Sequence, residues 1–485
     1  MKFLDRVFHF KERESSLKTE IIAGLVVFLS MFYVLPLNAT ILGSMGMSQT
    51  GVFFTTAIIS FAVCLIMGFV ANYPLALSTG MGLNSYLAYT VSLSIGFDWH
   101  QSLILLTISG LIFFVLSLTP VRRKIIESMP KDLKLILAAA LGAFICFVGL
   151  NNGGVIVSNP DTVVQLGSLA SPSTLIALVF TIICFGLNFS KHKRISSLAV
   201  PISILLVAIT GVIISTSMFA SGMTYEAVKE YSLPIVPWRD PEVSWKLDIG
   251  AIRDVFLYGL FSKENPYTLS DFGGHIVHVI SEPASYVAIF SIIFVNLFDT
   301  TATLFSIGGK VGIVDNEGKI VNYKRTVLAD ATGALICGPL GTSTVTSFAE
   351  SNIAVEIGAR TGLSSVVAGV LFLVSAFTYP IFSIFTCGCV TAPALVCVGT
   401  MIFVNNIKDI SWNDAVVTFT AFITLILTLL CYSISIGLGM GLITYVVMML
   451  CARRRKEINI VVYIMAAFFI VSFALTAIMP FLTKS

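Results

Sequence analysis

Charged side chains are scarce in this chain. Lysine, arginine, aspartate and glutamate make up 11% of its 485 residues, whereas hydrophobic residues make up 56%. The mean hydropathy is +0.94. A soluble globule needs more polar surface than this composition supplies. The sequence therefore predicts an all-α polytopic membrane protein, which we expect to lie in the lipid bilayer of the plasma membrane.

Motifs that signal an enzyme or a bound nucleotide are also missing. The chain has no GxxxxGK[ST] phosphate loop, no HExxH metal motif and no GxSxG nucleophile turn. The net charge of +3 is small, and the basic residues gather in short loops without interleaved aromatics, which argues against nucleic-acid binding. These absences predict a protein that is not an enzyme, with no cofactor and no metal site.

Apolar runs long enough to cross a bilayer recur along the chain. A helix of about 17–25 such residues spans the hydrocarbon core. The runs expected to cross are residues 21–42, 51–70, 102–118, 135–150, 174–188, 198–219, 286–307, 365–379, 382–404, 415–430, 436–450 and 460–478.

Two further apolar segments, residues 74–89 and 331–356, are interrupted in mid-run by glycine, serine, threonine or proline. Glycine and proline lower helix propensity. Backbone that is not helical at membrane depth is tolerated only where protein buries it or where it lines a cavity. We expect both segments to be broken elements that build a site.

The distribution of lysine and arginine predicts the topology. Basic clusters such as 122–124 and 453–456 fall on one side of the predicted crossings, whereas residues 151–172 contain no lysine or arginine. The positive-inside rule then places the basic clusters and the N-terminus in the cytoplasm. Residues 221–283 would lie outside, with a surface helix near 252–260.

The order of the segments predicts two inverted repeats of about seven crossings, each with a break in its third position. Residues 1–220 form the first repeat and 285–456 the second, and the outside region 221–284 separates them. The apolar segment within 457–485 is surplus. It is either an additional crossing or a sign that the count elsewhere is wrong by one.

Four acidic residues fall in or next to the membrane segments. Asp330 follows a Lys-Arg pair, and Glu356 precedes Arg360 by four positions, so an ion pair is the expected role of each. Asp299 and Glu350 have no basic residue nearby. A carboxylate inside a bilayer usually marks a substrate, ion or proton pathway, although hydrogen bonding that pins two segments together is the alternative.

None of the five histidines lies in a predicted crossing, so an imidazole proton relay is not expected. Asp299 and Glu350 are then the candidates for coupling transport to protons, because a carboxylate in a low dielectric can be neutralised by protonation. A sodium site built from oxygen ligands is an alternative that the sequence leaves open.

At these residues the chain resembles the AzgA-like purine permeases, a branch of the nucleobase transporter superfamily. The resemblance implies about fourteen membrane segments in two inverted sets, divided into a core domain and a gate domain. It also implies that the third and tenth segments are half-helices, each preceded by an extended stretch. The matching stretches are residues 19–24, 71–74, 80–85, 297–300, 328–331, 341–346 and 350–351.

The resemblance also implies a binding site. Its acids would be Asp299 in the eighth segment and Glu350 in the tenth, with Asn84 and Gly82 as contacts from the third. The predicted substrate-binding residues are Glu350, Asp299, Asn84, Gly82, Thr344 and Ser347.

We therefore expect a proton-coupled importer of guanine, hypoxanthine or adenine, in which the core moves like an elevator against the gate, with a homodimer also implied. Open alternatives are a carrier of uracil, xanthine or uric acid, an anion carrier of the same fold, or a sodium-coupled carrier. A channel is less favoured, because two broken segments with opposed carboxylates suit an occluded site better than an open pore.

Overall fold

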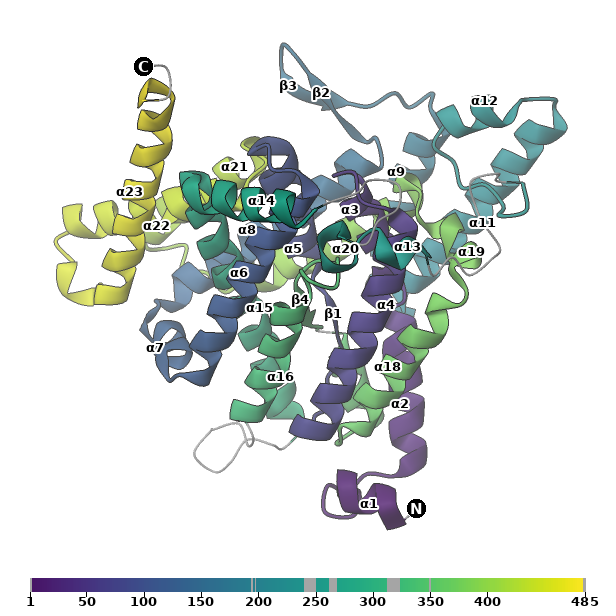
Figure 1. Cartoon of the computed structure of the whole chain (residues 1–485), viewed down its shortest axis with the longest axis horizontal. Coiled ribbons are helices and arrows are strands. Elements are labelled where there is room, and N and C mark those ends of the chain that lie inside the picture. The colour runs from purple at the N-terminus through teal and green to yellow at the C-terminus, as the bar shows by residue number, and fades with distance from the viewer. Residues whose placement is uncertain are drawn as a thin grey trace.

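Helices make up almost all of the computed structural model (Figure 1), which describes residues 2–192, 195–196, 198–239, 250–260, 268–311, 323–348 and 350–482. Among these residues, seven helices are long and apolar enough to cross a membrane, or nine if each of two bent helix pairs is one crossing. The predicted all-α membrane fold is confirmed.

The first half of the chain is a series of helices with one extended break near its start. Two π-helical stretches, Met67–Ala71 and Tyr86–Ser94, continue the helices on either side of this break. The elements are α1 (Lys2–Phe8), α2 (Leu17–Met31), α3 (Val34–Gly43), α4 (Gln49–Ile66), β1 (Leu77–Thr79), α5 (Met81–Ser85), α6 (Trp99–Leu118), α7 (Val121–Ser128), α8 (Lys131–Asn152), β2 (Ile156–Asn159), β3 (Val163–Leu166), α9 (Pro172–Asn188), α11 (Ala199–Ala220) and α12 (Tyr225–Glu230).

The second half repeats this plan with a break between α16 and α17. Its elements are α13 (Gly250–Arg253), α14 (Leu269–Ser281), α15 (Pro283–Val311), α16 (Tyr323–Ile336), β4 (Val345–Ser347), α17 (Ser351–Ile357), α18 (Leu363–Ala376), α19 (Tyr379–Phe382), α20 (Gly388–Ile407), α21 (Ala415–Leu430), α22 (Ile434–Cys451) and α23 (Ile460–Leu482).

Helix α16 corrects the predicted segment count. The break expected to begin at residue 331 begins only after Ile336, because residues 323–336 form a regular helix. Gly333 is tolerated in this helix because the close packing leaves no room for a side chain. A Cβ at this position would lie only 3.0 Å from side-chain atoms of Val345 and Val63. With α16 counted as a segment, the second break is the third element of its set, in the predicted position, and α23 is the segment that the sequence analysis already found to be surplus.

Two other boundaries differ from the prediction. The expected crossing at 382–404 starts only at Gly388, because α18 and α19 meet at a 90° bend. The expected surface helix near 252–260 is interrupted, since Leu257 and Tyr258 have φ of 46° and 62°. The longer helix of this region is α14, which the sequence analysis missed and which meets α15 at an 85° bend.

The two breaks pair with each other at the centre of the molecule (Figure 1). Strands β1 and β4 are antiparallel, with Leu77 opposite Ser347 and Thr79 opposite Val345. Two further backbone bonds extend the pair: Gly80 N donates to Thr344 O at 2.9 Å, and Phe348 N donates to Ala76 O at 3.2 Å. The pairing satisfies polar backbone at a depth where neither helix nor water does so.

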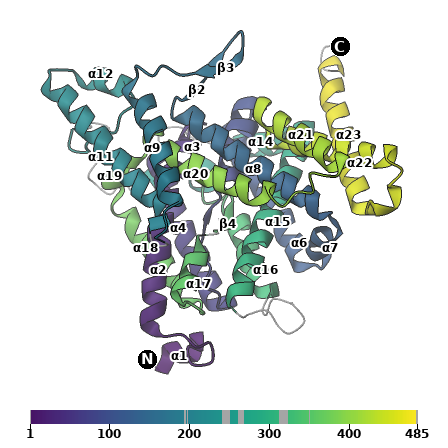
Figure 2. The ribbon, with the colours of Figure 1, turned by 180° about the vertical axis from the view of Figure 1, so that it is seen from behind.

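The helices divide into the core and gate domains. On one side, α2, α4 and α18 pack together and α6 packs against α16, around the strand pair. On the other side, α8 and α20 pack along each other, with α9, α11, α21 and α22 against them. Figure 2 shows α8 and α20 lying in front of β4. The two ends of the described chain lie at opposite ends of the molecule (Figure 1).

Candidate functional site

A cavity of about 770 Å³ lies between the strand pair and the gate helices. Its core-side wall includes Tyr33, Gly82, Ser347, Phe348 and Glu350, and its gate-side wall comes mainly from α8 and α20. Small-molecule sites commonly have volumes of roughly 300–1,000 Å³ and a mostly apolar lining with a few polar groups. The size, position and lining of this cavity suit such a ligand.

Glu350 is the carboxylate that the structure places on this cavity. It lies immediately before α17 and is partly exposed to the cavity. Its Oε1 accepts a hydrogen bond of 3.1 Å from the Tyr33 hydroxyl. This partner, in the described part of the chain, is a neutral donor and not a cation. Because Tyr33 is neutral, its hydrogen bond does not cancel the charge of the carboxylate. Glu350 can therefore still accept N–H bonds from a ligand.

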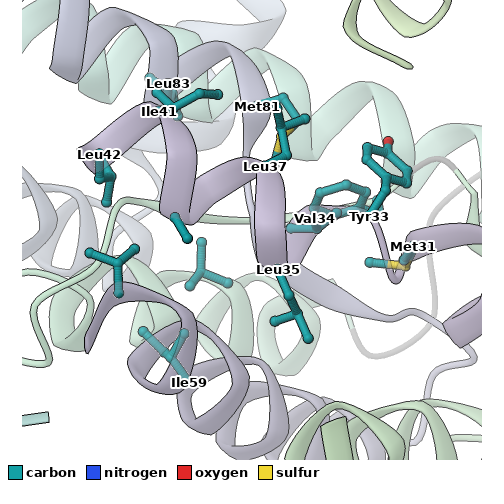
Figure 3. Close-up of a cluster of buried hydrophobic side chains, with 14 of the residues drawn as sticks. Met31, Tyr33, Val34, Leu35, Leu37, Ile41, Leu42, Ile59, Met81 and Leu83 are labelled. Atoms are coloured by element: carbon teal, nitrogen blue, oxygen red, sulfur yellow. The ribbon is translucent and has the colours of Figure 1, made fainter. Parts of the chain in front are cut away.

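The position of Tyr33 follows from a break between α2 and α3. Pro36 has no N–H, and its ring would clash with the carbonyl of residue 32 in a continuous helix. Helix α2 accordingly ends at Met31, and α3 starts at Val34. Figure 3 shows the Tyr33 ring beside the buried apolar side chains of α3, with its hydroxyl at the far end of the ring. The sequence analysis did not predict the contact between Tyr33 and Glu350. Pro36 was the signal that could have located the turn.

Ser347, the last residue of β4, brings a hydroxyl to the cavity. Its side chain is buried, and within the described residues its Oγ has no hydrogen-bond partner. Its carbonyl accepts from Thr303 Oγ1 of α15 at 3.4 Å. A buried hydroxyl without a partner is unusual because leaving it unpaired costs free energy. Ser347 Oγ is therefore a candidate ligand contact.

Asn84 lies in a different environment from the one predicted for it. It is fully buried and is not among the cavity-lining residues. Its Nδ2 donates to Asn38 Oδ1 at 2.6 Å, and its Oδ1 accepts from Ser343 Oγ. Asn38 Nδ2 in turn donates to Thr56 at 2.7 Å and to Thr342 at 2.9 Å. This network, which we call the Asn38–Asn84 network, joins α3, α4 and α5 to the segment before β4.

The other predicted site residues are divided between the cavity and the protein interior. Gly82 lines the cavity, and a Cβ there would lie 2.6 Å from Leu141 Cδ1 of α8. Thr344 is buried and is not among the cavity-lining residues, and its backbone carbonyl accepts a hydrogen bond from Gly80 N. Asp299 lies on α15, but its side chain is outside the described residues. Its predicted role therefore stays a prediction.

Asp330 forms the expected ion pair, with a different partner. Its Oδ2 lies 3.5 Å from Arg122 Nη2, and both side chains are almost completely buried. Thr300 Oγ1 donates to the same carboxylate at 3.0 Å, and the Arg122 guanidinium lies over the Phe113 ring. The sequence suggested the neighbouring Lys-Arg pair instead, because a partner on α7 is distant in the chain. Asp330 is a structural carboxylate of the core domain.

Two other acidic residues have surroundings that the sequence did not predict. Glu356 lines the cavity, whereas an ion pair with Arg360 was expected; the Arg360 guanidinium donates to the carbonyls of residues 355 and 359. Glu20 is fully buried and accepts from the backbone N–H groups of Arg360, Thr361 and Ser364 just before and within the first turn of α18. Glu20 therefore caps a helix, as an acidic group at a helix N-terminus should.

Comparison with known proteins agrees with this architecture. A model described as the permease family, Xan_ur_permease, matches residues 18–448. The guanine/hypoxanthine permease PbuG of Bacillus subtilis is 35% identical over 96% of this chain and 98% of its own length. The adenine permease AdeQ of Escherichia coli is 32% identical over 96% of this chain and 95% of its own length.

A solved structure shares the fold at much lower identity. The transmembrane domain of the cyanobacterial bicarbonate transporter BicA superposes with a TM-score of 0.58 at 14% identity, covering 87% of this chain and 97% of that one. The relatives are permeases, so this chain is a transporter and not an enzyme. By its sequence motifs, its paired broken segments and the match over most of its length, the chain belongs to the permease family.

Proposed function

We propose that this permease imports purine nucleobases (guanine, hypoxanthine or adenine) across the plasma membrane. The observation that carries the proposal is Glu350, a carboxylate that is hydrogen-bonded to the neutral Tyr33 hydroxyl at the wall of a cavity of about 770 Å³. The names of the relatives PbuG and AdeQ support the purine class.

The polar groups on the cavity wall match the hydrogen-bonding pattern of a purine. Its ring and exocyclic N–H groups are donors, and a carboxylate such as Glu350 can accept two of them. Its carbonyl or ring nitrogens are acceptors for the Ser347 hydroxyl and for the first N–H groups of α5, which have no partner in a preceding turn. The Phe348 ring lines the same cavity and could cover one face of the base.

Proton coupling is the finer part of the proposal. Inward movement of a base would be driven by protonation of Glu350 or Asp299, because neutralising a carboxylate lowers the cost of moving it through a low-dielectric region. Sodium coupling is the competing hypothesis, and it would need a set of oxygen ligands for the ion.

An elevator movement suits the way in which the site is held. The β1–β4 bonds and the Asn38–Asn84 network tie both broken segments into one unit. The facing wall is largely apolar side chains of α8, such as Leu141 and Ile145. A rigid core can slide past such a wall without breaking many hydrogen bonds.

We further propose that the N-terminus is cytoplasmic, that residues 1–220 and 285–456 are the repeats, and that the protein forms a homodimer.

A competition panel tests the substrate. Cells that express the protein would be given radiolabelled hypoxanthine with an excess of one unlabelled competitor. Guanine, hypoxanthine and adenine should each reduce uptake strongly, whereas uracil, xanthine, uric acid and bicarbonate should not. Competition by uracil or uric acid without competition by the purines named above would replace the proposed substrate.

Ion dependence tests the coupling. A protonophore should stop concentrative uptake, and replacing sodium with choline should leave it unchanged. Asp299→Asn should also stop accumulation, whereas Asp161→Asn, a change at an exposed position between β2 and β3, should not. Uptake that survives the protonophore but needs sodium would overturn proton coupling.

A further inference from the structure

Three potential metal ligands gather where α6 begins, away from the cavity. Asp98 precedes α6, His100 is on its first turn, and His275 is on α14. Their ligand atoms all lie within 4.8 Å of one another. Two of the five histidines in the chain thus meet one carboxylate, although they are far apart in the sequence.

Both histidines lie at ion-pair distance from Asp98, and these distances are close to the ligand separations of a metal coordination sphere. His100 Nδ1 lies 3.7 Å from Asp98 Oδ1, and His275 Nε2 lies 3.6 Å from Asp98 Oδ2. Hydrogen bonds between such atoms are shorter, roughly 2.7–3.2 Å. Two ligands of a tetrahedral Zn²⁺, each about 2.0–2.1 Å from the metal, are separated by roughly 3.3–3.4 Å. Small side-chain movements would therefore complete the sphere.

Neighbouring groups already orient two of the ligands. Asp98 Oδ1 accepts from Gln101 N at 2.7 Å, and Gln101 Oε1 accepts from Asp98 N at 3.2 Å, which fixes the carboxylate in a capping box. The Trp99 ring stacks on the His100 imidazole at a centroid distance of 3.5 Å. Such supporting contacts are typical of metal sites, because they hold a ligand in one orientation.

We propose that Asp98, His100 and His275 form a binding site for a zinc-class transition-metal ion, with the fourth position open to water. Two imidazoles and one carboxylate suit zinc, cobalt or nickel and disfavour calcium or magnesium, which prefer oxygen ligands. The bound ion joins α14 to the start of α6. It thereby fixes the 85° bend at which α14 leads into α15, the helix that carries Asp299 and Thr303.

The site stands apart from the proposed transport function, because none of its residues lines the cavity. The sequence analysis predicted no metal site because it found no known metal-binding motif, and His275 is far from Asp98 and His100 in the sequence. Folding brings α14 to α6 and creates the cluster.

Metal binding to the purified, detergent-solubilised full-length protein tests the proposal. Zn²⁺ added to metal-free protein should bind at about one ion per chain and raise the thermal unfolding temperature, and Ca²⁺ should do neither. Bound Co²⁺ should give the visible absorption of a tetrahedral site. The affinity for Zn²⁺ should fall at least about tenfold in His275→Ala, since losing even a supporting group costs about 10–100-fold.

Two variants control for indirect effects. Asp98→Asn removes the charged ligand but keeps a good helix cap, so it should weaken Zn²⁺ binding without lowering the stability of the metal-free protein. His278→Ala changes a histidine of the same helix that packs edge-on against Phe97, and it should bind Zn²⁺ as the wild type does. Equal Zn²⁺ affinity in wild type, His275→Ala and Asp98→Asn would overturn the site, as would an equal loss in His278→Ala.

Discussion

The two broken segments occupy corresponding places in the fold and pair strand to strand, yet Asn84 of the first and Glu350 of the second have opposite surroundings. In the first break, both ends of the Asn84 amide bond to Asn38 and Ser343 in a fully buried network. In the second, Glu350 and Ser347 line the cavity, and the Ser347 hydroxyl lacks a partner in the described part of the chain. We call the first the closed break, after its buried and bonded Asn84 amide, and the second the open break, after the Glu350 and Ser347 side chains at the cavity.

This difference shows that inverted repeats need not share their chemistry equally. A buried polar network that is fully satisfied rigidifies a fold, whereas an unsatisfied polar group next to a cavity is available to a substrate. The first break supplies the frame and a glycine backbone at the cavity wall. The second break supplies the side chains that can bind. Substitutions that affect stability and substrate affinity separately can test this division.

The largest effect is expected at the open break. Glu350→Gln keeps the size of the side chain and its bond with Tyr33, but it removes the charge that would accept purine N–H groups and the proton. Accumulation of radiolabelled hypoxanthine should fall to background while the amount of protein in the membrane stays normal. Glu230→Gln, at the exposed end of α12, is the matched control. Normal accumulation in Glu350→Gln would remove Glu350 from the site.

The next largest effect is expected at the closed break, on stability. Asn84→Ala removes the two hydrogen bonds that the buried amide makes with Asn38 and Ser343, although Ser343 Oγ can still donate to Asn38 Oδ1 at 3.2 Å. The lost bonds should cost about 1–3 kcal/mol. The purified protein should unfold at a lower temperature, and the protein that does fold should keep a KM close to that of the wild type. Asn38→Ala should behave in the same way. A greatly raised KM with normal thermal stability would instead make Asn84 a substrate contact, as its sequence position suggested.

Sequence reasoning located both breaks, because glycine, serine and proline within an apolar run interrupt a helix, and a bilayer tolerates such an interruption only where protein or a cavity surrounds it. It identified Glu350 because a carboxylate without a basic neighbour stands out in an apolar segment. It could not distinguish the environments of Asn84 and Glu350. Both are polar residues in a broken segment, and only the tertiary contacts with Asn38 and Tyr33 separate them.

Long-range partners explain most of the remaining errors. Asp330 pairs with Arg122, and Glu20, to which the sequence analysis gave no role, caps α18; in both cases the partner is distant in the sequence. Helix α16 was overlooked because Gly333 looked like part of the break, whereas it is a packing glycine beside Val345. Local patterns predict where a helix is interrupted, but they do not specify what packs against it.

Tyr33→Phe examines how far the open break depends on its neighbour. The change removes the hydroxyl that donates to Glu350 Oε1 at 3.1 Å and leaves the aromatic ring in place. A hydrogen bond to a charged group contributes about 1.5–3 kcal/mol, but cavity water can replace part of it. We expect hypoxanthine uptake to fall roughly tenfold, with thermal stability nearly unchanged. Tyr231→Phe, in an exposed turn, is the control. Uptake equal to the wild type would show that Glu350 does not need this donor.

Ser347→Ala should give the smallest effect and the sharpest separation between the two breaks. Because the hydroxyl is buried without a partner in the described protein, its removal should leave thermal stability unchanged or slightly higher. If the hydroxyl bonds the base, the KM for hypoxanthine should rise about fivefold, the equivalent of about 1 kcal/mol. Asn84→Ala is expected to show the reverse pattern, with lower stability and an unchanged KM. A Ser347→Ala protein with unchanged KM would mean that the open break binds its substrate through Glu350 and the backbone, without this hydroxyl.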